Sequence, residues 1–384
     1  MGFLRNEEQR QLVHSAEVFL AAQSPVSLQR RIRDSGAAQA MDPALWQQVI
    51  DLGWPAAVFS EDDGGLGVGY RGMGGVFQAC GRHLAALPLL SSAVLCGSLL
   101  SNTGDAAQKA HWLAPLIEGR LALALAMDES GRHDPHRIAT RARLEGGQWH
   151  LQGEKWFVID GLGADAFVVT ARLDGGADAD AGAGAGNIGL FVMAADTPGL
   201  QVQPLHMADS RNYARMQLAG VLLPADALLA ACPDSAQALD AALDLGRICL
   251  AAEAMGLIRY AFDTTLAYLK ERVQFGVPIG SFQALQHRMA RLYTEIEMLQ
   301  SCVLAALDAI DQGDPELPLL ASLAKARASD LCEKAMNEAV QMHGGIGVTD
   351  ALDLGLYVKR ARLVQQCLGD GVFHRARYAR LRGI

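Results

Sequence analysis

Two glycine-containing segments in the C-terminal third of the chain carry residue types that can bind a phosphate group. The first runs from Arg272 to Gln283 (RVQFGVPIGSFQ) and the second from Gln341 to Gly347 (QMHGGIG). Arginine forms paired hydrogen bonds with phosphate oxygens, and a glycine turn exposes backbone N–H groups that attract anions. Both segments are therefore candidate pyrophosphate sites, although an ordinary turn between two helices explains the same residues and is the simpler interpretation.

Other segments that match ligand-binding motifs lack the surroundings that the chemistry requires. The segment Gly184–Gly189 (GAGNIG) fits the dinucleotide pattern G-x-G-x-x-G, but a predicted strand follows where a helix should begin. His133 and His136 flank Asp134 with no third ligand nearby, so we expect polar surface residues and no metal site. The sequence contains no Walker loop, no His-Glu-x-x-His and no Gly-x-Ser-x-Gly motif.

The elements that must position these segments fall into three regions. From residue 6 to about 122 the pattern is helical, and Asp42 and Pro43 begin a helix that ends before Gly53. The glycines of Glu61–Tyr70 (EDDGGLGVGY) predict a turn between two helical stretches. The first region is therefore expected to be a helical domain, residues 1–122.

The middle region, residues 123–232, is expected to be a β-barrel or sandwich. Short segments rich in β-forming residues are separated by Gly, Asp and Pro clusters at a spacing typical of such domains. The composition of Asp174–Gly186, almost entirely Gly, Ala and Asp, predicts a flexible surface loop. The predicted strands are Gln148–Gln152, Trp156–Ile159, Ala166–Ala171, Gly189–Met193, Leu200–Gln203 and Met216–Leu223.

The last region, residues 233–384, is expected to be a helical bundle. Apolar residues recur every three or four positions from Phe282 to Leu299, which predicts one long amphipathic helix. Asp314, Pro315 and Pro318 interrupt the pattern before a second long helix, which is predicted to span Leu319–Met342.

The composition restricts the class of protein. The 384 residues carry a net charge of −9 and are 51% hydrophobic, which favours a multi-domain globular protein over a disordered, nucleic-acid-binding or anionic-membrane-binding one. Leu84–Leu100 is too short and too interrupted to cross a membrane and is expected to be a core helix. The N-terminus lacks the apolar segment of a signal peptide, and the seven cysteines are scattered, so we expect a cytoplasmic protein with reduced thiols.

The sequence resembles the acyl-CoA dehydrogenase family along its whole length. The most specific matches are RVQFGVPIGSFQALQ, from Arg272, and QMHGGIG, from Gln341. EDDGGLGVGY from Glu61, GEKWFVIDG from Gly153 and GVLLPADALL from Gly220 match less specific family segments. The resemblance implies an α+β fold with an N-terminal helical domain, a middle β domain and a C-terminal four-helix bundle.

The family binds FAD between subunits, so the resemblance also implies FAD as cofactor and an oligomer. The first C-terminal segment would reach the pyrophosphate and adenosine of FAD in a neighbouring subunit, and the second would present side-chain and backbone groups to the same dinucleotide. An aromatic residue of the middle domain would replace the family's tryptophan against the flavin ring. The positions assigned to FAD in this way are Arg272, Gln274, Phe275, Gln283, Gln341, Gly344, Gly345 and Phe157.

The resemblance fails at the catalytic base. The family's reaction removes the α proton of an acyl thioester with a carboxylate held in a dry pocket, and passes the β hydride to the flavin. The glutamate of most members corresponds here to Leu368, and that of some relatives to Gly246, which directly precedes Arg247. Asp370 is the carboxylate closest in sequence and is a candidate substitute. Glu253 lies two helical turns from Gly246, about 10 Å along a helix, which is too far.

The middle domain departs from the family too. Met127–Asp134 corresponds to a flavin-binding loop, but it is shortened and lacks the usual hydroxyl groups. Ile159 replaces a threonine whose hydroxyl faces flavin N5 in the family. These losses indicate that the base and β-domain half of a site has been lost, whereas the adenosine-binding half is retained.

The end of the chain is most similar to the small, glutamate-lacking subunits of bacterial α2β2 acyl-CoA dehydrogenases, such as those for pimeloyl-CoA and steroid side-chain thioesters. The leading hypothesis is an FAD-binding subunit that acts on acyl-CoA with a related chain that supplies the glutamate. Electron-transfer flavoprotein is the expected electron acceptor. Two alternatives stay open: a self-sufficient enzyme, for instance a homo-oligomer, that uses Asp370 as base, and a non-catalytic scaffold subunit. The acyl chain is not identified.

Overall fold

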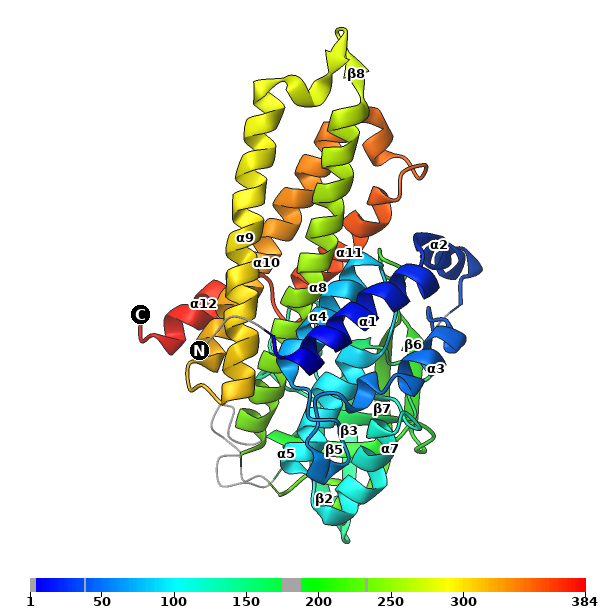
Figure 1. The fold of residues 1–384 in the computed structure, drawn as a ribbon. Helices are drawn as coiled ribbons and strands as arrows, with labels where there is room; N and C mark the ends of the chain where they lie inside the picture. Colours follow the sequence, from blue (N-terminus) through cyan, green and yellow to red (C-terminus); the bar gives the residue numbers. More distant parts are fainter. Residues whose placement is uncertain (1–4, 38, 175–187, 232–233) are drawn as a thin grey trace. The chain divides into compact units, whose positions relative to one another are not determined.

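The computed structural model describes residues 5–37, 39–174, 188–231 and 234–384 (Figure 1). Contacts divide the chain into two compact units, each built from separate stretches of sequence. The first unit comprises Met1–Arg31, Val68–Ala85 and Arg247–Ile384, and the second comprises Ile32–Gly67 and Ala86–Gly246. The domain boundaries at residues 122 and 232 stay predictions.

The first unit consists mainly of helices. In Figure 1, α8, α9 and α10 run side by side, and the β8–β9 hairpin projects from the end at which α8 leads into α9. The first turns of α8 belong to the second unit. The elements are α1 (Glu7–Gln23), α4 (Tyr70–Arg82), α8 (Ser235–Glu271), β8 (Val273–Gln274), β9 (Val277–Pro278), η7 (Ile279–Ser281), α9 (Gln283–Gln312), α10 (Leu317–His343), η8 (Gly344–Val348), α11 (Leu354–Gln366) and α12 (Gly371–Leu381).

Glycines let α4 and α8 pack with their backbones in contact. A Cβ atom on Gly81 would lie 2.0 Å from the carbonyl oxygen of Glu253, and one on Gly256 would lie 1.9 Å from that of Gln78. Any larger residue would force the helices apart. This close crossing fixes the central part of α8, which leads towards the first candidate segment.

A carboxylate from α9 caps the N-terminus of α4. Asp311 accepts hydrogen bonds from the backbone N–H groups of Tyr70 (2.6 Å) and Arg71 (3.0 Å), and the Arg71 side chain pairs with Asp308. The first N–H groups of a helix have no partner within the helix, so Asp311 supplies both hydrogen bonds and a favourable charge. Burial raises the pKa of Asp311, although these N–H groups oppose the shift.

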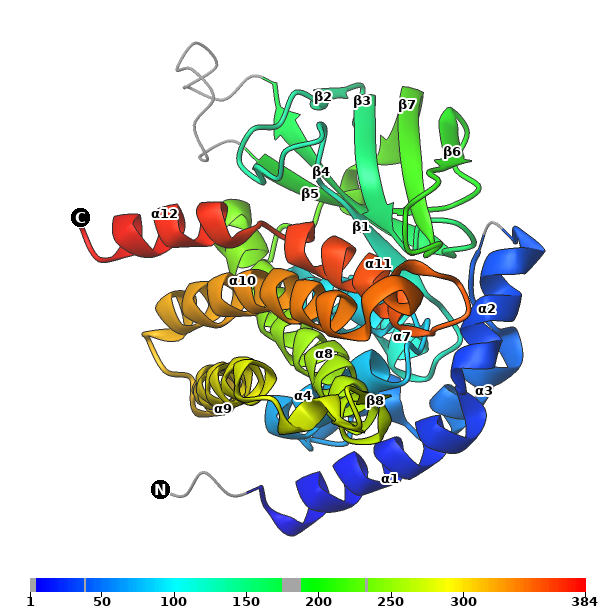
Figure 2. The same cartoon turned by 90° about the horizontal axis from the view of Figure 1, so that it is seen from above.

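The second unit contains a mixed sheet. Among the described residues, its strands are ordered β1-β4-β2-β3-β7-β6, with β5 paired to β4, and β4 runs parallel to β1 and β2 (Figure 2). The strands are β1 (Leu123–Ala126), β2 (Arg141–Glu145), β3 (Gln148–Ile159), β4 (Ala166–Leu173), β5 (Ile188–Ala194), β6 (Leu200–Pro204) and β7 (Tyr213–Pro224).

Short helices complete the second unit, and α2 (Val26–Ser35) crosses the boundary between the two units. Two of these helices, η3 and η4, are π-helices, and η1, η2 and η6 are 3-10 helices. The helices are α3 (Pro43–Asp51), η1 (Trp54–Ala56), η2 (Glu61–Asp63), η3 (Leu89–Gly97), α5 (Ser98–Thr103), α6 (Ala106–Gln108), η4 (Lys109–Leu113), α7 (Ala114–Ile117) and η6 (Ala225–Ala227).

The order of helical, β and helical regions is confirmed, with differences in detail. The two strands predicted over 148–159 are one strand, β3, whose ladder with β7 shifts register twice. The sequence analysis missed β1 and β2. The predicted core helix over Leu84–Leu100 was wrong at its start, because its helical part begins only after Pro88. Apart from Asp174, the predicted loop over Asp174–Gly186 lies outside the described residues.

The Asp311 cap predicts a measurable contribution to stability. Replacing Asp311 with Ala leaves the first N–H groups of α4 without their acceptor, so the free energy of unfolding should fall by about 1–3 kcal/mol. Urea denaturation of the purified chain measures this change. Asp330→Ala is the matched control, because Asp330 pairs with Arg375 at the surface, where an ion pair contributes under about 1 kcal/mol. Equal effects of the two substitutions would contradict the assigned cap.

Candidate functional site

The first candidate segment forms a two-residue β-hairpin after α8. Phe275 and Gly276 connect β8 to β9 with φ angles of 55° and 81°, the positive values of a type I′ turn. Phe275 is 91% exposed at the tip, and its ring meets that of Phe282 edge to face at 6.1 Å. The hairpin thus presents an aromatic residue to solvent.

The polar residues of this segment are exposed beside the hairpin. The backbone of Arg272 is fixed, since its N–H donates to Tyr268 (2.8 Å) and its carbonyl accepts from Ile279 (2.8 Å). Its guanidinium contacts no hydrogen-bonding or ion-pairing partner among the described residues. Gln274 donates only to the neighbouring backbone, and Gln283 begins α9 with its side chain exposed.

The second candidate segment lies at the end of α10, close to the first. The buried His343 ring stacks on Tyr268 of α8 with centroids 4.5 Å apart, and its Nδ1 lies 2.8 Å from the carbonyl oxygen of Ala339. Because Tyr268 also accepts the hydrogen bond from Arg272, this stack brings the ends of α8 and α10 together. The two segments separated by about seventy residues are thus neighbours.

The glycines of the second segment leave the backbone open. Gly344 has a φ of 66°, and a Cβ atom placed on Gly344 or Gly345 would meet no atom within 4 Å. Gln341 is exposed on the last turn of α10. An open glycine backbone beside the unpaired guanidinium of Arg272 fits an anionic dinucleotide such as FAD.

The aromatic residue expected at the flavin lies on an irregular part of β3. Phe157 has a φ of 54°, where the register of β3 against β7 shifts between Lys155 and Val158. Its neighbour Trp156 stacks with the guanidinium of Arg215 at 4.5 Å. The bulge turns Phe157 out of the regular alternation of the strand.

The loop that corresponds to the family's flavin loop is held by its own charged residues. His133 hydrogen-bonds to Asp128 at 3.1 Å, and Glu129 accepts from the backbone N–H of Thr140 (2.9 Å) and from Nζ of Lys155 (2.7 Å). Burial would raise the pKa of Glu129, but Lys155 and these hydrogen bonds lower it overall. No group of residues suited to a metal ion occurs in the described part of the chain.

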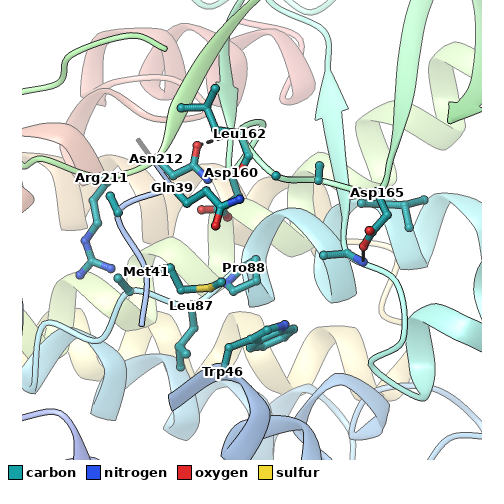
Figure 3. A pocket seen from close by; sticks show the side chains of 16 residues that line it. Gln39, Met41, Trp46, Leu87, Pro88, Asp160, Leu162, Asp165, Arg211 and Asn212 are labelled. Carbon is teal, nitrogen blue, oxygen red and sulfur yellow. Dashed lines mark hydrogen bonds between the residues drawn. The ribbon is translucent and has the colours of Figure 1, made fainter. Parts of the chain in front are cut away.

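A cavity of about 190 Å³ lies in the second unit beside the end of β3 (Figure 3). Asp160 has a φ of 54° and accepts a hydrogen bond from Ser91 (2.6 Å), and Asn212 bonds the backbone of Leu162 on both its N–H and carbonyl. Trp46 lies across the cavity from these polar residues. The sequence analysis missed this cavity, because its lining comes from several distant segments. The one sequence signal near it is the position of Asp160 directly after Ile159.

Neither position of the missing base carries a carboxylate. Leu368 is buried with a φ of 55°, at the turn between α11 and α12. The carboxylate of Asp370 caps α12 by accepting from the N–H of Phe373 (2.8 Å). Glu253 forms a buried two-point ion pair with Arg360 (2.7 and 2.9 Å). Asp370 and Glu253 therefore already have structural partners.

Comparison with models of known protein families supports the resemblance to acyl-CoA dehydrogenases over nearly the whole chain. Models of the N-terminal, middle and C-terminal domains of acyl-CoA dehydrogenases match residues 6–120, 122–220 and 236–380. The chain belongs to the acyl-CoA dehydrogenase family. The expected fold is thereby confirmed, and FAD is the cofactor of this family. No helix of the described residues is long and apolar enough to span a membrane.

Individual acyl-CoA dehydrogenases are similar over most of their length. The chain is 31% identical to acyl-CoA dehydrogenase FadE12 of Mycobacterium tuberculosis, over 84% of this chain and 83% of that one. It is 32% identical to the probable acyl-CoA dehydrogenase YngJ of Bacillus subtilis, over 85% of each. A chain of the ChsE4–ChsE5 complex of Mycobacterium tuberculosis is 25% identical, with a TM-score of 0.89 over 100% of this chain and 99% of that one.

The buried Lys155 predicts a pH dependence of stability. Burial lowers the pKa of Lys155 from 10.5 to about 8, against the opposing effect of Glu129. Between pH 8 and 10.5 the unfolded chain then binds more protons at this lysine than the folded chain, so this contribution to stability rises with pH, by as much as about 1.4 kcal/mol per unit.

The test compares variants across this range. Urea unfolding from pH 7.5 to 9.5 should show a smaller gain, or a larger loss, for Lys155→Met than for the unsubstituted chain. Lys334→Met is the control, since Lys334 pairs with Glu295 at the surface, and it should keep the original slope. An unchanged slope in Lys155→Met would contradict the shifted pKa.

Proposed function

We propose that this chain is the FAD-binding subunit of an acyl-CoA dehydrogenase that introduces an α,β double bond into an acyl-CoA thioester. In this proposal a second, related chain supplies the catalytic glutamate, most simply in an α2β2 assembly. The observation that carries it is the combination of an open dinucleotide-binding surface with base positions that hold Leu368 and Gly246.

The cofactor half rests on the two neighbouring segments of the first unit. Arg272 and the backbone N–H groups of Gly344 and Gly345 would neutralise the pyrophosphate, while Gln274, Gln283 and Gln341 would hydrogen-bond the adenosine end. Phe275 would cover an apolar face of the cofactor or of the neighbouring subunit, and Phe157 would form a wall against the ring. When bound, FAD supplies the hydride acceptor.

The proposal that another chain supplies the base rests on the contacts that Asp370 and Glu253 already make. Asp370 holds the first turn of α12, and Glu253 is locked to Arg360. Moving either one to a substrate would break a helix cap or a two-point ion pair in a poorly exposed site, which is unfavourable by a few kcal/mol. A partner chain with a glutamate at the position of Leu368 or Gly246 avoids this loss.

Similarity to solved structures supports the proposed partner and substrate. A chain of the ChsE4–ChsE5 complex shares the fold, and a complex of two different chains is the arrangement that the proposal requires. Acyl-CoA, with a fatty or steroid side-chain acyl group, is the proposed substrate, and electron-transfer flavoprotein is the proposed electron acceptor. A homo-oligomer is the competing assembly.

The proposal predicts that the chain alone does not oxidise acyl-CoA. The purified chain, supplied with FAD, should show no bleaching of flavin absorbance on addition of acyl-CoA. Co-expression with a related chain that carries the glutamate should restore it. Robust turnover by the chain alone would overturn the proposal and favour a self-sufficient enzyme.

Substitution of Asp370 separates the two possibilities. In a self-sufficient enzyme that uses Asp370 as base, Asp370→Asn should reduce flavin reduction at least 100-fold. In a paired enzyme, the same change should leave the rate of the complex within about threefold and should weaken only the cap of α12, because an Asn side chain still caps a helix. Stopped-flow flavin bleaching measures both.

The cofactor assignment predicts that substitution of Arg272 causes the assembled protein to lose FAD. Arg272→Ala should weaken FAD retention by the complex at least tenfold, because a charge-assisted contact with the pyrophosphate is removed. Arg143→Ala is the control, since Arg143 is an exposed arginine of β2 that pairs with Glu145. Fluorescence of released flavin measures retention, and equal retention in both variants would contradict the assignment.

A further inference from the structure

The cavity shown in Figure 3 is a feature of the second unit that the proposed function does not use. Its polar lining residues come mainly from the loop after β3 and the turn before β7, and its apolar ones mainly from around the start of α3 and from the segment before η3. All of them belong to the second unit, whereas the two candidate FAD segments belong to the first. Its volume of about 190 Å³ suits a ligand smaller than a drug-sized molecule.

Strained backbone is concentrated around this cavity. Ala40 and Asp160 line it, and Ser210 directly precedes the lining residue Arg211. Their φ angles are 46°, 54° and 56°, in the left-handed region that residues other than glycine rarely adopt. Seven non-glycine residues of the described chain have a positive φ, so three of the seven belong to this small region. Residues strained in this way cluster at sites that hold a ligand.

Asp160 is fixed by contacts of both its backbone and its side chain. Its N–H donates to the carbonyl oxygen of Asn212 (3.0 Å), and its carboxylate accepts from the hydroxyl of Ser91 (2.6 Å). Asn212 in turn bonds both the N–H and the carbonyl of Leu162 (3.0 and 2.8 Å), which holds the loop after β3 in place. Because a carboxylate can accept about four hydrogen bonds, the bond from Ser91 leaves Asp160 able to accept others from a ligand.

A glycine brings a second polar side chain to the cavity. Gly163 has a φ of 78°, and a Cβ atom at this position would lie 2.2 Å from Nε2 of Gln39. The amide of Gln39 therefore lies directly over the backbone of Gly163. Its carbonyl oxygen adds a neutral hydrogen-bond acceptor to the lining that already contains the Asp160 carboxylate.

The chemistry of the lining favours a cation with an apolar body. Trp46 lies across the cavity from Asp160 (Figure 3), and the face of a tryptophan ring attracts positive charge. The charged lining residues are two carboxylates, Asp160 and Asp165, and one guanidinium, Arg211, which together give a formal net charge of −1. In Figure 3 the Arg211 side chain runs along one side of the cavity, apart from Asp160 and Trp46.

We propose that this cavity binds a small organic amine, with its ammonium group at Asp160 and its apolar body against Trp46. An ammonium group has three hydrogen-bond donors and no acceptor, which matches the carboxylate of Asp160 and the carbonyl oxygen of Gln39. This site is independent of the proposed function, because the residues assigned there to FAD and to the catalytic base do not line it.

Three probes of the same shape and different charge test the class of ligand. Benzylamine, benzyl alcohol and benzoate are titrated into the full-length chain at pH 7 by isothermal calorimetry. Benzylamine should bind at one site per chain, with a Kd at least tenfold lower than that of either other probe. Absence of saturable benzylamine binding, equal affinity for the three probes, or tighter binding of benzoate, as expected for a site directed by Arg211, would each overturn the proposal.

Substitution of Asp160 locates the ammonium group. Asparagine tolerates a positive φ and can still accept the hydrogen bond from Ser91, so Asp160→Asn removes the charge and keeps the backbone. The Kd for benzylamine should rise at least tenfold. Asp196→Asn is the matched control, because Asp196 is an exposed aspartate of the same unit outside the lining, and its Kd should stay within twofold.

Substitution of Trp46 tests the apolar wall separately. Trp46→Leu keeps an apolar side chain but removes the ring, and the Kd for benzylamine should rise at least fivefold. Circular dichroism and urea midpoints establish that each variant is folded. An unchanged Kd in a folded Asp160→Asn or Trp46→Leu chain, or an equal rise in the Asp196→Asn control, would contradict the assigned site.

Discussion

The stack of Tyr268 on His343 is the contact that joins the two candidate cofactor-binding segments. It joins the last turns of α8 and α10, and Tyr268 also accepts the hydrogen bond that orients the backbone of Arg272. The stack itself is worth only about 1 kcal/mol, but it ties together the ends of the two helices that lead into the candidate segments.

The turn at Leu368 is held by several hydrogen bonds, in contrast to the single stacking contact between Tyr268 and His343. There the backbone carbonyls accept hydrogen bonds from three buried side chains on three helices, Lys325, Arg247 and His374. A fixed backbone with an exchanged side chain is how a protein can lose one chemical group while its fold stays unchanged. The same fold can then serve either as a complete enzyme or as one half of a pair.

The sequence indicated the order of regions and the two candidate segments, because these depend on local patterns. The elements that the sequence analysis missed were missed for physical reasons. β1 reads as LALA with no alternation, since it is buried on both faces and pairs in parallel with β4. β2 carries Arg141, Arg143 and Glu145 on its exposed face, so it looks like a loop.

Charged residues in the interior were the least predictable part. Lys155 lies in a strand pattern and Lys325 in a helix pattern. Lysine is usually found at the surface in such patterns, yet both side chains are fully buried. Their positions follow from partners distant in sequence, Glu129 and Thr170 for one and the turn carbonyls for the other. No local pattern encodes such a partner, and the same holds for the contact of Asp311 with α4.

The exposed tip of the β8–β9 hairpin has a consequence for how the protein exists in solution. Covering a phenylalanine side chain is worth roughly 2 kcal/mol, and Phe275 obtains little of this while the chain is alone, because its ring meets Phe282 but is 91% exposed. Mass action then ties the stability of the protein to the concentration of whatever covers the ring. At low concentration of any covering surface, this exposed ring stays available for association with other apolar surfaces, so the solution behaviour of the chain should depend on whether Phe275 is covered.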